Sequence, residues 1–275
     1  MAYVRRGSSL APISYPTGDV TILSSDGKMH KVHSFILFEA AGYFMERYNY
    51  AIGDSSAFIE VQSSTETLNY ILGFLYPRQT APTFPSHCAK SVFTAVEGLG
   101  LTSHALHTAL TTWLIQESHP IRAWAIASRF GYTTARKAAV ERYIRDPNEY
   151  IEVEAPSDLS LVPGQNMVNL IALRRNAISA ATKLVRSIPS MHFCGTHSCK
   201  GWLWSLDEEL QYHSPFSTWL MSERTMYLIA HKHCSGCAGV FDLARFRIVE
   251  RQVKKCLEQA LEKEGTFWAE YYYQG

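Results

Sequence analysis

The chain has 275 residues, of which 47% are hydrophobic, and a formal net charge of +1 at pH 7. This length accommodates one large or two modest domains, and the near-neutral charge gives no reason to expect a nucleic-acid partner. No apolar run approaches the roughly 18 residues that span a bilayer, and no signal peptide is apparent, so we expect a soluble cytoplasmic or nuclear protein without a membrane partner.

A β-hairpin followed by a helix is predicted close to the N-terminus. Two β-prone runs, Val20–Leu23 and Met29–Val32, flank an Asp-Gly dipeptide ending at Gly27, which tolerates the positive φ of a tight turn. The apolar run Phe35–Phe38 is expected to be helical. Ser34 is the expected N-cap of this helix, because its hydroxyl can accept a free backbone N–H of the first turn.

One more strand and three helices are predicted before residue 116. The strand falls at Ile59–Val61, and the first helix carries apolar residues at i, i+3, i+4 and i+7 from Leu68. Residues 1–16 lack periodicity and are expected to form a flexible leader. A sheet followed by helices indicates an α+β domain over residues 17–116, with helices flanking a small mixed sheet.

This arrangement resembles the BTB/POZ domain. The family begins with Asp-Val on an alternating strand, continues through a Gly turn to Val-His-x-x-x-Leu, and then has a small-residue pair and Tyr-Phe. The matching residues are Asp19-Val20, Asp26-Gly27, Val32-His33, Leu37, Ala40-Ala41 and Tyr43-Phe44. Gly42 stands where the family usually has Ser. The resemblance covers residues 17–116 and implies a domain that binds other proteins.

The resemblance also implies self-association. BTB-like domains commonly pair through their first strand and helix, and large apolar residues on a small domain favour a symmetric contact that buries one patch twice. The residues predicted for this face are Val20, Ile22, Phe35, Phe38, Tyr43 and Phe44. The alternative is that the C-terminal helices of the same chain cover the face.

A mostly α-helical C-terminal region is predicted after Pro120. The pattern Ala-Trp-Ala-Ile-Ala-x-Arg-Phe-Gly, followed by Ala-x-x-Ala-Ala, is similar to the BACK-like helical segment after the BTB domain of many fungal BTB proteins. We therefore expect a BACK-like region over residues 117–190 and a Cys/Trp-rich helical region over residues 191–275. A last amphipathic helix is predicted from Asp242 to Glu264, and the Tyr271–Tyr273 run after it either packs back on the core or stays exposed.

Four cysteines in the last region form two closely spaced pairs that suit a structural zinc ion. Four thiolates can surround Zn²⁺ tetrahedrally, and fungal BTB proteins of this type often carry Cys pairs here. Packed free thiols are one alternative, and a disulfide or redox pair is another. The predicted ligands are Cys194, Cys199, Cys234 and Cys237. Nearby histidines could replace a thiolate or hydrogen-bond to a ligand: His192, His197, His231 and His233.

The other candidate side chains are expected to be structural. Cys88 and Cys256 lie at apolar positions of predicted helices, where core packing is the commoner role. His104 and His107 could bind a metal from one helix face, although histidines on a surface or in packing contacts are far commoner. The imidazole of His33 is expected to be partly buried and bonded to the backbone.

No catalytic constellation is visible in the sequence, which lacks a nucleophile elbow, a phosphate-binding glycine loop and a His-Glu-x-x-His motif. The resemblance implies a non-enzymatic adaptor or scaffold, one that could recruit targets to a cullin-type ubiquitin ligase. The alternative is a transcription or chromatin regulator whose Cys-rich region binds nucleic acid. A zinc or thiol enzyme is a third hypothesis, but the general acid–base partners are missing.

Overall fold

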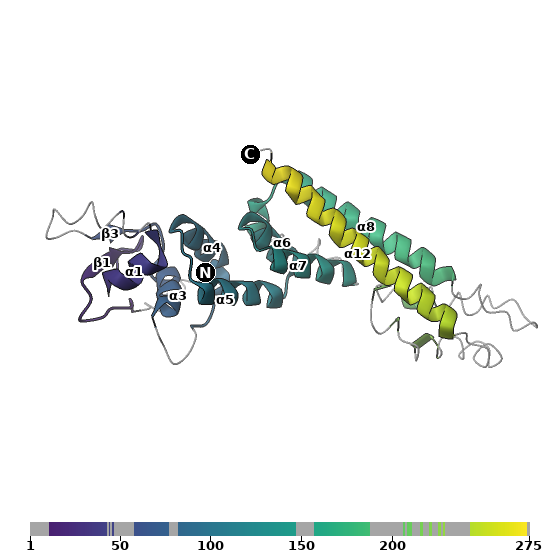
Figure 1. Ribbon diagram of the computed structural model, residues 1–275, viewed down its shortest axis with the longest axis horizontal. Coiled ribbons are helices and arrows are strands. Elements are labelled where there is room, and N and C mark those ends of the chain that lie inside the picture. The colour runs from purple at the N-terminus through teal and green to yellow at the C-terminus, as the bar shows by residue number, and fades with distance from the viewer. Residues whose placement is uncertain are drawn as a thin grey trace, which may run out of the picture. The chain divides into compact units, whose positions relative to one another are not determined.

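The computed structural model describes residues 11–42, 44, 46, 58–76, 82–146, 157–187 and 243–273, with a few positions between 206 and 228. The chain forms two compact units, residues 1–116 and 117–275, here called the N-terminal and C-terminal units. A three-stranded mixed sheet lies in the N-terminal unit, and the other described elements of the chain are helices (Figure 1). This confirms an α+β chain in which helices predominate.

The sheet has the strand order β2-β1-β3. β1 (Val20–Leu23) pairs antiparallel with β2 (Met29–Val32) and parallel with β3 (Ile59–Glu60). Gly27 has a φ of 76° in the turn between β1 and β2, a conformation that a side chain disfavours. The two strands of the hairpin therefore begin and end where the alternating pattern predicts.

The helices of the N-terminal unit follow the sheet strands in the chain. They are α1 (Ser34–Ala40), α3 (Thr65–Leu75), the 3₁₀ turn η1 (Ser86–Cys88), α4 (Ala89–Gly98) and α5 (His104–Gln116). Helix α3 packs against α1, α4 and α5, which makes it the central helix of this unit. Its buried face contains Leu68, Ile71 and Leu72, as the i, i+3, i+4 spacing predicts.

The N-terminus of α1 is capped by a side chain from outside the helix. Ser34 is the first helical residue, and its backbone N and Oγ both donate to the Asp19 carboxylate, at 2.7 Å and 2.6 Å. The prediction that Ser34 is the N-cap is therefore wrong. The side-chain hydrogen bond from Ser34 holds the pKa of Asp19 below its usual value. Asp19 thus ties the start of β1 to the start of α1.

Part of the segment predicted to be a flexible leader is held by hydrogen bonds. Tyr15 N donates to the carbonyl of Lys31 at 2.7 Å, and Ile13 N donates to Asn69 Oδ1 at 2.9 Å. Asn69 Nδ2 in turn donates to the carbonyl of Ala11 at 2.9 Å. Residues 11–15 are therefore fixed against β2 and α3, a contact that sequence periodicity does not reveal.

The C-terminal unit is built from two groups of helices. Its elements are α6 (Pro120–Arg129), α7 (Thr133–Arg145), the 3₁₀ turn η3 (Ser157–Leu161), α8 (Gly164–Ser187) and α12 (Leu243–Tyr273). α6 packs on α7, and α12 runs along α8 (Figure 1). The α8–α12 pair joins the segments predicted as separate regions, 117–190 and 191–275. The helix predicted to end at Glu264 continues through the tyrosine run.

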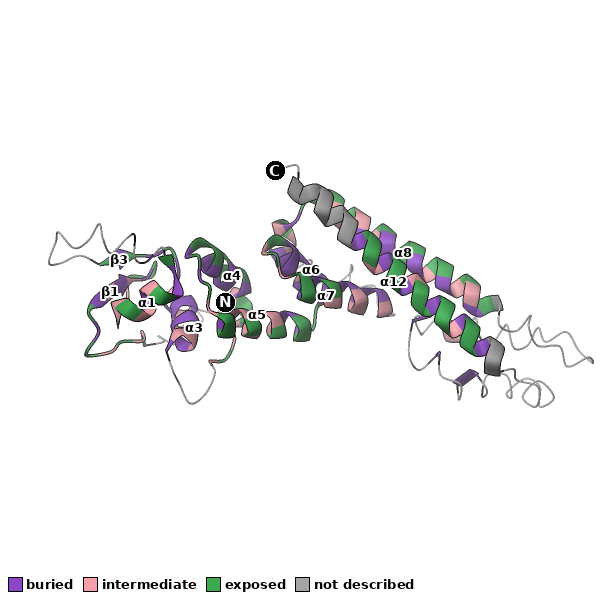
Figure 2. Cartoon of the chain, viewed as in Figure 1, coloured by how far each residue is buried: buried purple, intermediate pink, exposed green. Residues whose placement is uncertain are grey.

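Alanines allow the close approach of α6 and α7. Ala123, Ala125 and Ala127 of α6 are buried, as are Ala135 and Ala139 of α7. Side chains this small let two helix backbones pack with little separation. Figure 2 shows the buried surface of α6 and α7, and the mixture of buried and exposed residues along α8 and α12.

Buried ion pairs link the helices of this unit. Arg136 Nε of α7 lies 3.2 Å from Glu264 Oε1 of α12, and Trp124 Nε1 of α6 donates to the same oxygen at 3.2 Å. The side chains of Arg136 and Glu264 are only 10% and 3% exposed. Because both charges are removed from water, their pairing offsets part of the cost of burying each of them.

A half-buried arginine, Arg122, holds the 3₁₀ turn against α6. Arg122 Nε donates to Asp158 Oδ2 at 2.7 Å, and its Nη1 donates to Glu117 Oε2 at 3.1 Å. Two carboxylates share one guanidinium, whose fixed fork of donors suits this arrangement. The contact places η3 against the start of α6 within the C-terminal unit.

His30 of β2 is a titratable side chain in the core of the N-terminal unit. It has no exposed surface, and burial lowers its pKa from the usual 6.5, while Asp26 acts in the opposite direction. The folded-state pKa is therefore below the unfolded-state pKa. As the pH falls below 6.5, His30 is protonated first in the unfolded state. The free energy of unfolding is therefore unaffected by His30 above this pH and decreases progressively below it.

Replacing His30→Leu is expected to remove this pH dependence. In urea titrations between about pH 7.5 and pH 5, the wild-type midpoint of the N-terminal unit should fall, and that of His30→Leu should fall much less. His104→Leu, at an exposed position of α5, is the control and should keep the wild-type dependence. Equal pH dependence of wild type and His30→Leu would contradict the assignment.

Candidate functional site

Four aromatic rings gather where β2 leads into α1. The rings of Tyr15 and Tyr76 stack with their centroids 4.3 Å apart. The centroid of the His33 imidazole lies 5.6 Å from Tyr15, 5.9 Å from Tyr76 and 5.7 Å from Phe35. We call these four residues the aromatic cluster. Tyr15 precedes β1, and His33 lies between β2 and α1. Phe35 belongs to α1, and Tyr76 directly follows α3.

Hydroxyl groups fix His33 within the aromatic cluster. Its backbone N donates to Tyr76 Oη at 2.6 Å, and its ring Nδ1 lies 3.3 Å from the same oxygen. Ring Nε2 lies 2.9 Å from Thr17 Oγ1. The imidazole is half-buried, as predicted, but its partners are side-chain hydroxyls instead of backbone groups. Burial raises the pKa of Tyr76, so this hydroxyl stays protonated and serves as a hydrogen-bonding group.

Phe35 is the exposed member of the aromatic cluster. It is 64% exposed, whereas Tyr76 is buried and Tyr15 and His33 are half-buried. An exposed aromatic ring that rests on a fixed aromatic base can bury a large area against a partner without first losing much side-chain freedom. The chemistry of this cluster therefore suits recognition of an apolar or aromatic group.

The residues predicted for a self-association face do not share one surface. Val20, Ile22 and Phe44 are buried in the core, with exposed fractions of 5%, 0% and 1%. These three side chains are therefore covered within a single chain and offer little surface to a second copy. Phe35 is exposed and Phe38 is half-buried. Tyr43 lies outside the described residues.

The predicted zinc ligands Cys194, Cys199, Cys234 and Cys237 all lie outside the described residues, as do the four histidines near them. Within the described part of the chain, one different group could hold a metal ion: Glu66, His87 and Cys88, whose ligand atoms all lie within 4.8 Å of one another. Glu66 is in the first turn of α3, and the other two are in η1. We call this group the Glu–His–Cys triad.

The electrostatics of the triad centre on the Cys88 thiol. Burial, and then the nearby Glu66 carboxylate, raise the pKa of Cys88 to about 11. His87 Nε2 lies 3.0 Å from Glu66 Oε2, and Cys88 Sγ donates to the carbonyl of Pro85 at 3.4 Å. The thiol is therefore protonated at neutral pH in the absence of a cation. Cys88 was predicted to be a core residue, but it is half-buried at the start of α4.

The other predicted candidates have local structural contacts. His107 Nε2 lies 2.8 Å from the Leu101 carbonyl, just before α5. His104 Nε2 lies 3.4 Å from Thr108 Oγ1, one turn further along the helix. The two histidines thus contact different groups, in keeping with the expectation that they are packing or surface residues.

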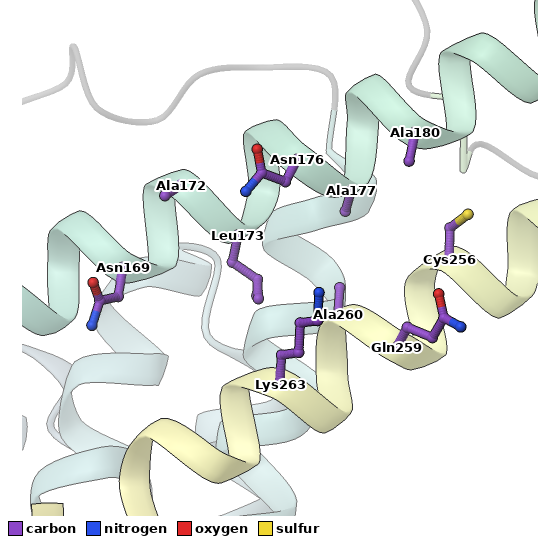
Figure 3. Close-up of a pocket in the computed structure, with 10 residues that line it drawn as sticks. All are labelled: Asn169, Ala172, Leu173, Asn176, Ala177, Ala180, Cys256, Gln259, Ala260 and Lys263. Carbon is purple, nitrogen blue, oxygen red and sulfur yellow. The ribbon is translucent and has the colours of Figure 1, made fainter. Parts of the chain in front are cut away.

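An open groove of about 540 Å³ lies between α8 and α12 (Figure 3). Small side chains leave this space open, among them Ala172, Ala177 and Ala180 of α8 and Ala260 of α12. Cys256 lines the same groove from α12. Burial raises the pKa of the Cys256 thiol, which therefore stays protonated and is a poor nucleophile at neutral pH.

Comparison with known proteins assigns no function to the aromatic cluster, the Glu–His–Cys triad or the groove. Among the described helices, none combines the length and hydrophobicity needed to cross a bilayer. No family model and no curated protein matches this sequence.

Proposed function

We propose that this protein is a non-enzymatic interaction protein, an adaptor or scaffold of the BTB type, whose N-terminal unit binds a protein partner through the aromatic cluster. The observation that carries the proposal is the 64% exposure of Phe35 beside the His33 ring, which is itself held by Tyr15 and Tyr76 through ring contacts and hydrogen bonds. Aromatic residues, Phe among them, are enriched in protein–protein interfaces relative to the rest of the surface.

The sequence resemblance supports the same proposal. The Asp-Val and Val-His elements of the BTB-like pattern have clear structural roles here, since Asp19 caps α1 and His33 holds the aromatic cluster together. Through these contacts, Asp19 and His33 fix the junction between β2 and α1. A fold alone does not define a function, so the proposal depends on the surface that this junction presents.

The proposal is tested with the variant Phe35→Asp. The proteins that co-purify with the tagged full chain from native cells are compared between this variant and the wild type. At least one abundant partner should be reduced by about tenfold or more, since loss of a binding hot spot typically costs 2 kcal/mol or more. Ile115→Asp is the control, because Ile115 is also exposed and apolar but lies on α5. If both variants and the wild type recover the same partners in equal amounts, the proposal is wrong.

The finer form of the proposal names a cullin-type ubiquitin ligase as the assembly that this adaptor joins. A cullin among the partners lost with Phe35→Asp would support it. A second copy of this chain is the other expected partner, and light scattering at several concentrations would detect it as a mass near twice 31.1 kDa. Self-association that depends on Phe35 would place the contact at the aromatic cluster and not at the buried Val20 and Ile22.

We also propose that Cys194, Cys199, Cys234 and Cys237 bind one structural zinc ion in a reducing compartment, the cytoplasm or nucleus. The double variant Cys234→Ser/Cys237→Ser should contain one zinc fewer per chain than the wild type by elemental analysis. Because structural zinc contributes directly to folding, the C-terminal unit should melt at a lower temperature while the N-terminal unit is unchanged. Equal zinc content in variant and wild type would contradict this assignment.

A further inference from the structure

Three metal-binding groups of different chemistry converge on the surface of the N-terminal unit. The carboxylate of Glu66 comes from α3, whereas His87 and Cys88 precede α4. Their ligand atoms lie within 4.8 Å of one another, close enough for one ion to contact all three after small side-chain adjustments. The Glu–His–Cys triad shares no residue with the four cysteines discussed above.

The surroundings of the triad allow a cation to enter. The side chain of His87 is 71% exposed and that of Glu66 is 33% exposed, so both can rotate toward an ion from solvent. Cys88 is more constrained, because it is half-buried and lies in η1. One fixed ligand and two adjustable ligands can adapt to the short bonds that a metal ion requires.

The charges of the triad favour a bound cation. Without a cation, burial and the neighbouring Glu66 carboxylate both disfavour a negatively charged Cys88 thiolate. A divalent ion that contacts both groups reverses this balance, because it neutralises the two negative charges. On binding, the metal–sulfur bond replaces the S–H bond, and the proton is released to solvent.

The ligand types indicate which cation fits. A set of one thiolate, one imidazole and one carboxylate combines soft and hard donors, which suits Zn²⁺ or a similar ion and not Mg²⁺ or Ca²⁺. Three protein ligands leave the fourth tetrahedral position for water. We propose that Glu66, His87 and Cys88 form a zinc site in the N-terminal unit that links α3 to the start of α4.

The site is tested on the full chain with Co²⁺ as a spectroscopic probe and Zn²⁺ as the competitor. The wild type should show a thiolate-to-cobalt absorption band that Cys88→Ser diminishes and that added Zn²⁺ abolishes. Elemental analysis should find one zinc fewer per chain in Cys88→Ser. His87→Ala should weaken the affinity of this one site by roughly tenfold or more, since losing even a hydrogen-bonding partner of a metal ligand costs about that much.

Two controls separate this site from the other cysteines. Cys256→Ser removes a half-buried thiol of α12 and should keep the wild-type metal content. Cys234→Ser/Cys237→Ser should lose a different ion and keep the absorption that depends on Cys88. Because His87 is largely exposed, His87→Ala is expected to fold normally even if Cys88→Ser does not. Unchanged metal content and affinity in His87→Ala, measured on folded protein, would overturn the proposal.

Discussion

Replacing Glu264→Ala is expected to destabilise the C-terminal unit by about 3–5 kcal/mol, because it removes a carboxylate that pairs with the buried Arg136 guanidinium. The two side chains are 10% and 3% exposed, and Trp124 loses its hydrogen-bond acceptor in the same substitution. The three residues belong to α7, α12 and α6, so the loss should loosen the contacts among these helices. Urea denaturation, with hydrogen exchange of the peptides of α7 and α12, measures the effect.

Two further variants show whether the buried charge is the cause. Glu262→Ala changes an exposed residue of the same helix and should alter stability by no more than about 0.5 kcal/mol. The double variant Arg136→Met/Glu264→Leu removes both charges and should recover much of the lost stability, since apolar replacement of a buried pair is often neutral. A double variant as unstable as Glu264→Ala would show that packing is responsible instead.

Replacing Phe44→Ala is expected to destabilise the N-terminal unit by about 3–5 kcal/mol, the usual cost of removing a buried aromatic ring. Phe44 is 1% exposed within a single chain, so its contacts belong to folding and not to assembly. Thermal denaturation should therefore show the same loss at low and high protein concentration.

Phe35→Ala is the matched substitution, since it removes the same side chain from an exposed position of α1. It should change the stability of the unit by less than about 0.5 kcal/mol while weakening partner binding. If Phe44→Ala left stability unchanged and lowered only the apparent mass in solution, Phe44 would instead be a self-association residue.

Local sequence patterns predicted the elements whose determinants are local. The hairpin strands follow from alternation and from the glycine that the turn requires, and α3 follows from its apolar spacing. The cap of α1 was missed because Asp19 acts across the hairpin, 15 positions before Ser34. Likewise, the pairing of α8 with α12 depends on contacts between distant segments, which no single-sequence pattern specifies.

The candidate sites were predicted less well for the same physical reason. His33 stood out as a motif residue, but Tyr15 and Tyr76 join it only through packing of distant segments. In the Glu–His–Cys triad, His87 and Cys88 are neighbours, and Glu66 approaches them only because α3 packs on α4. A His-Cys dipeptide was the available signal, but helical spacing favoured a core role for the cysteine.

The central claim, that the aromatic cluster contacts another protein, is tested most directly by photocrosslinking in native cells. Phe35 is replaced by p-benzoylphenylalanine, which keeps an aromatic ring at this position, and Ile115 is replaced in the same way as the reference. We expect irradiation to crosslink position 35 to a specific protein, identified by mass spectrometry, and to give a different or weaker pattern from position 115. Crosslinks from position 35 that match those from position 115, or none from either, would contradict the account.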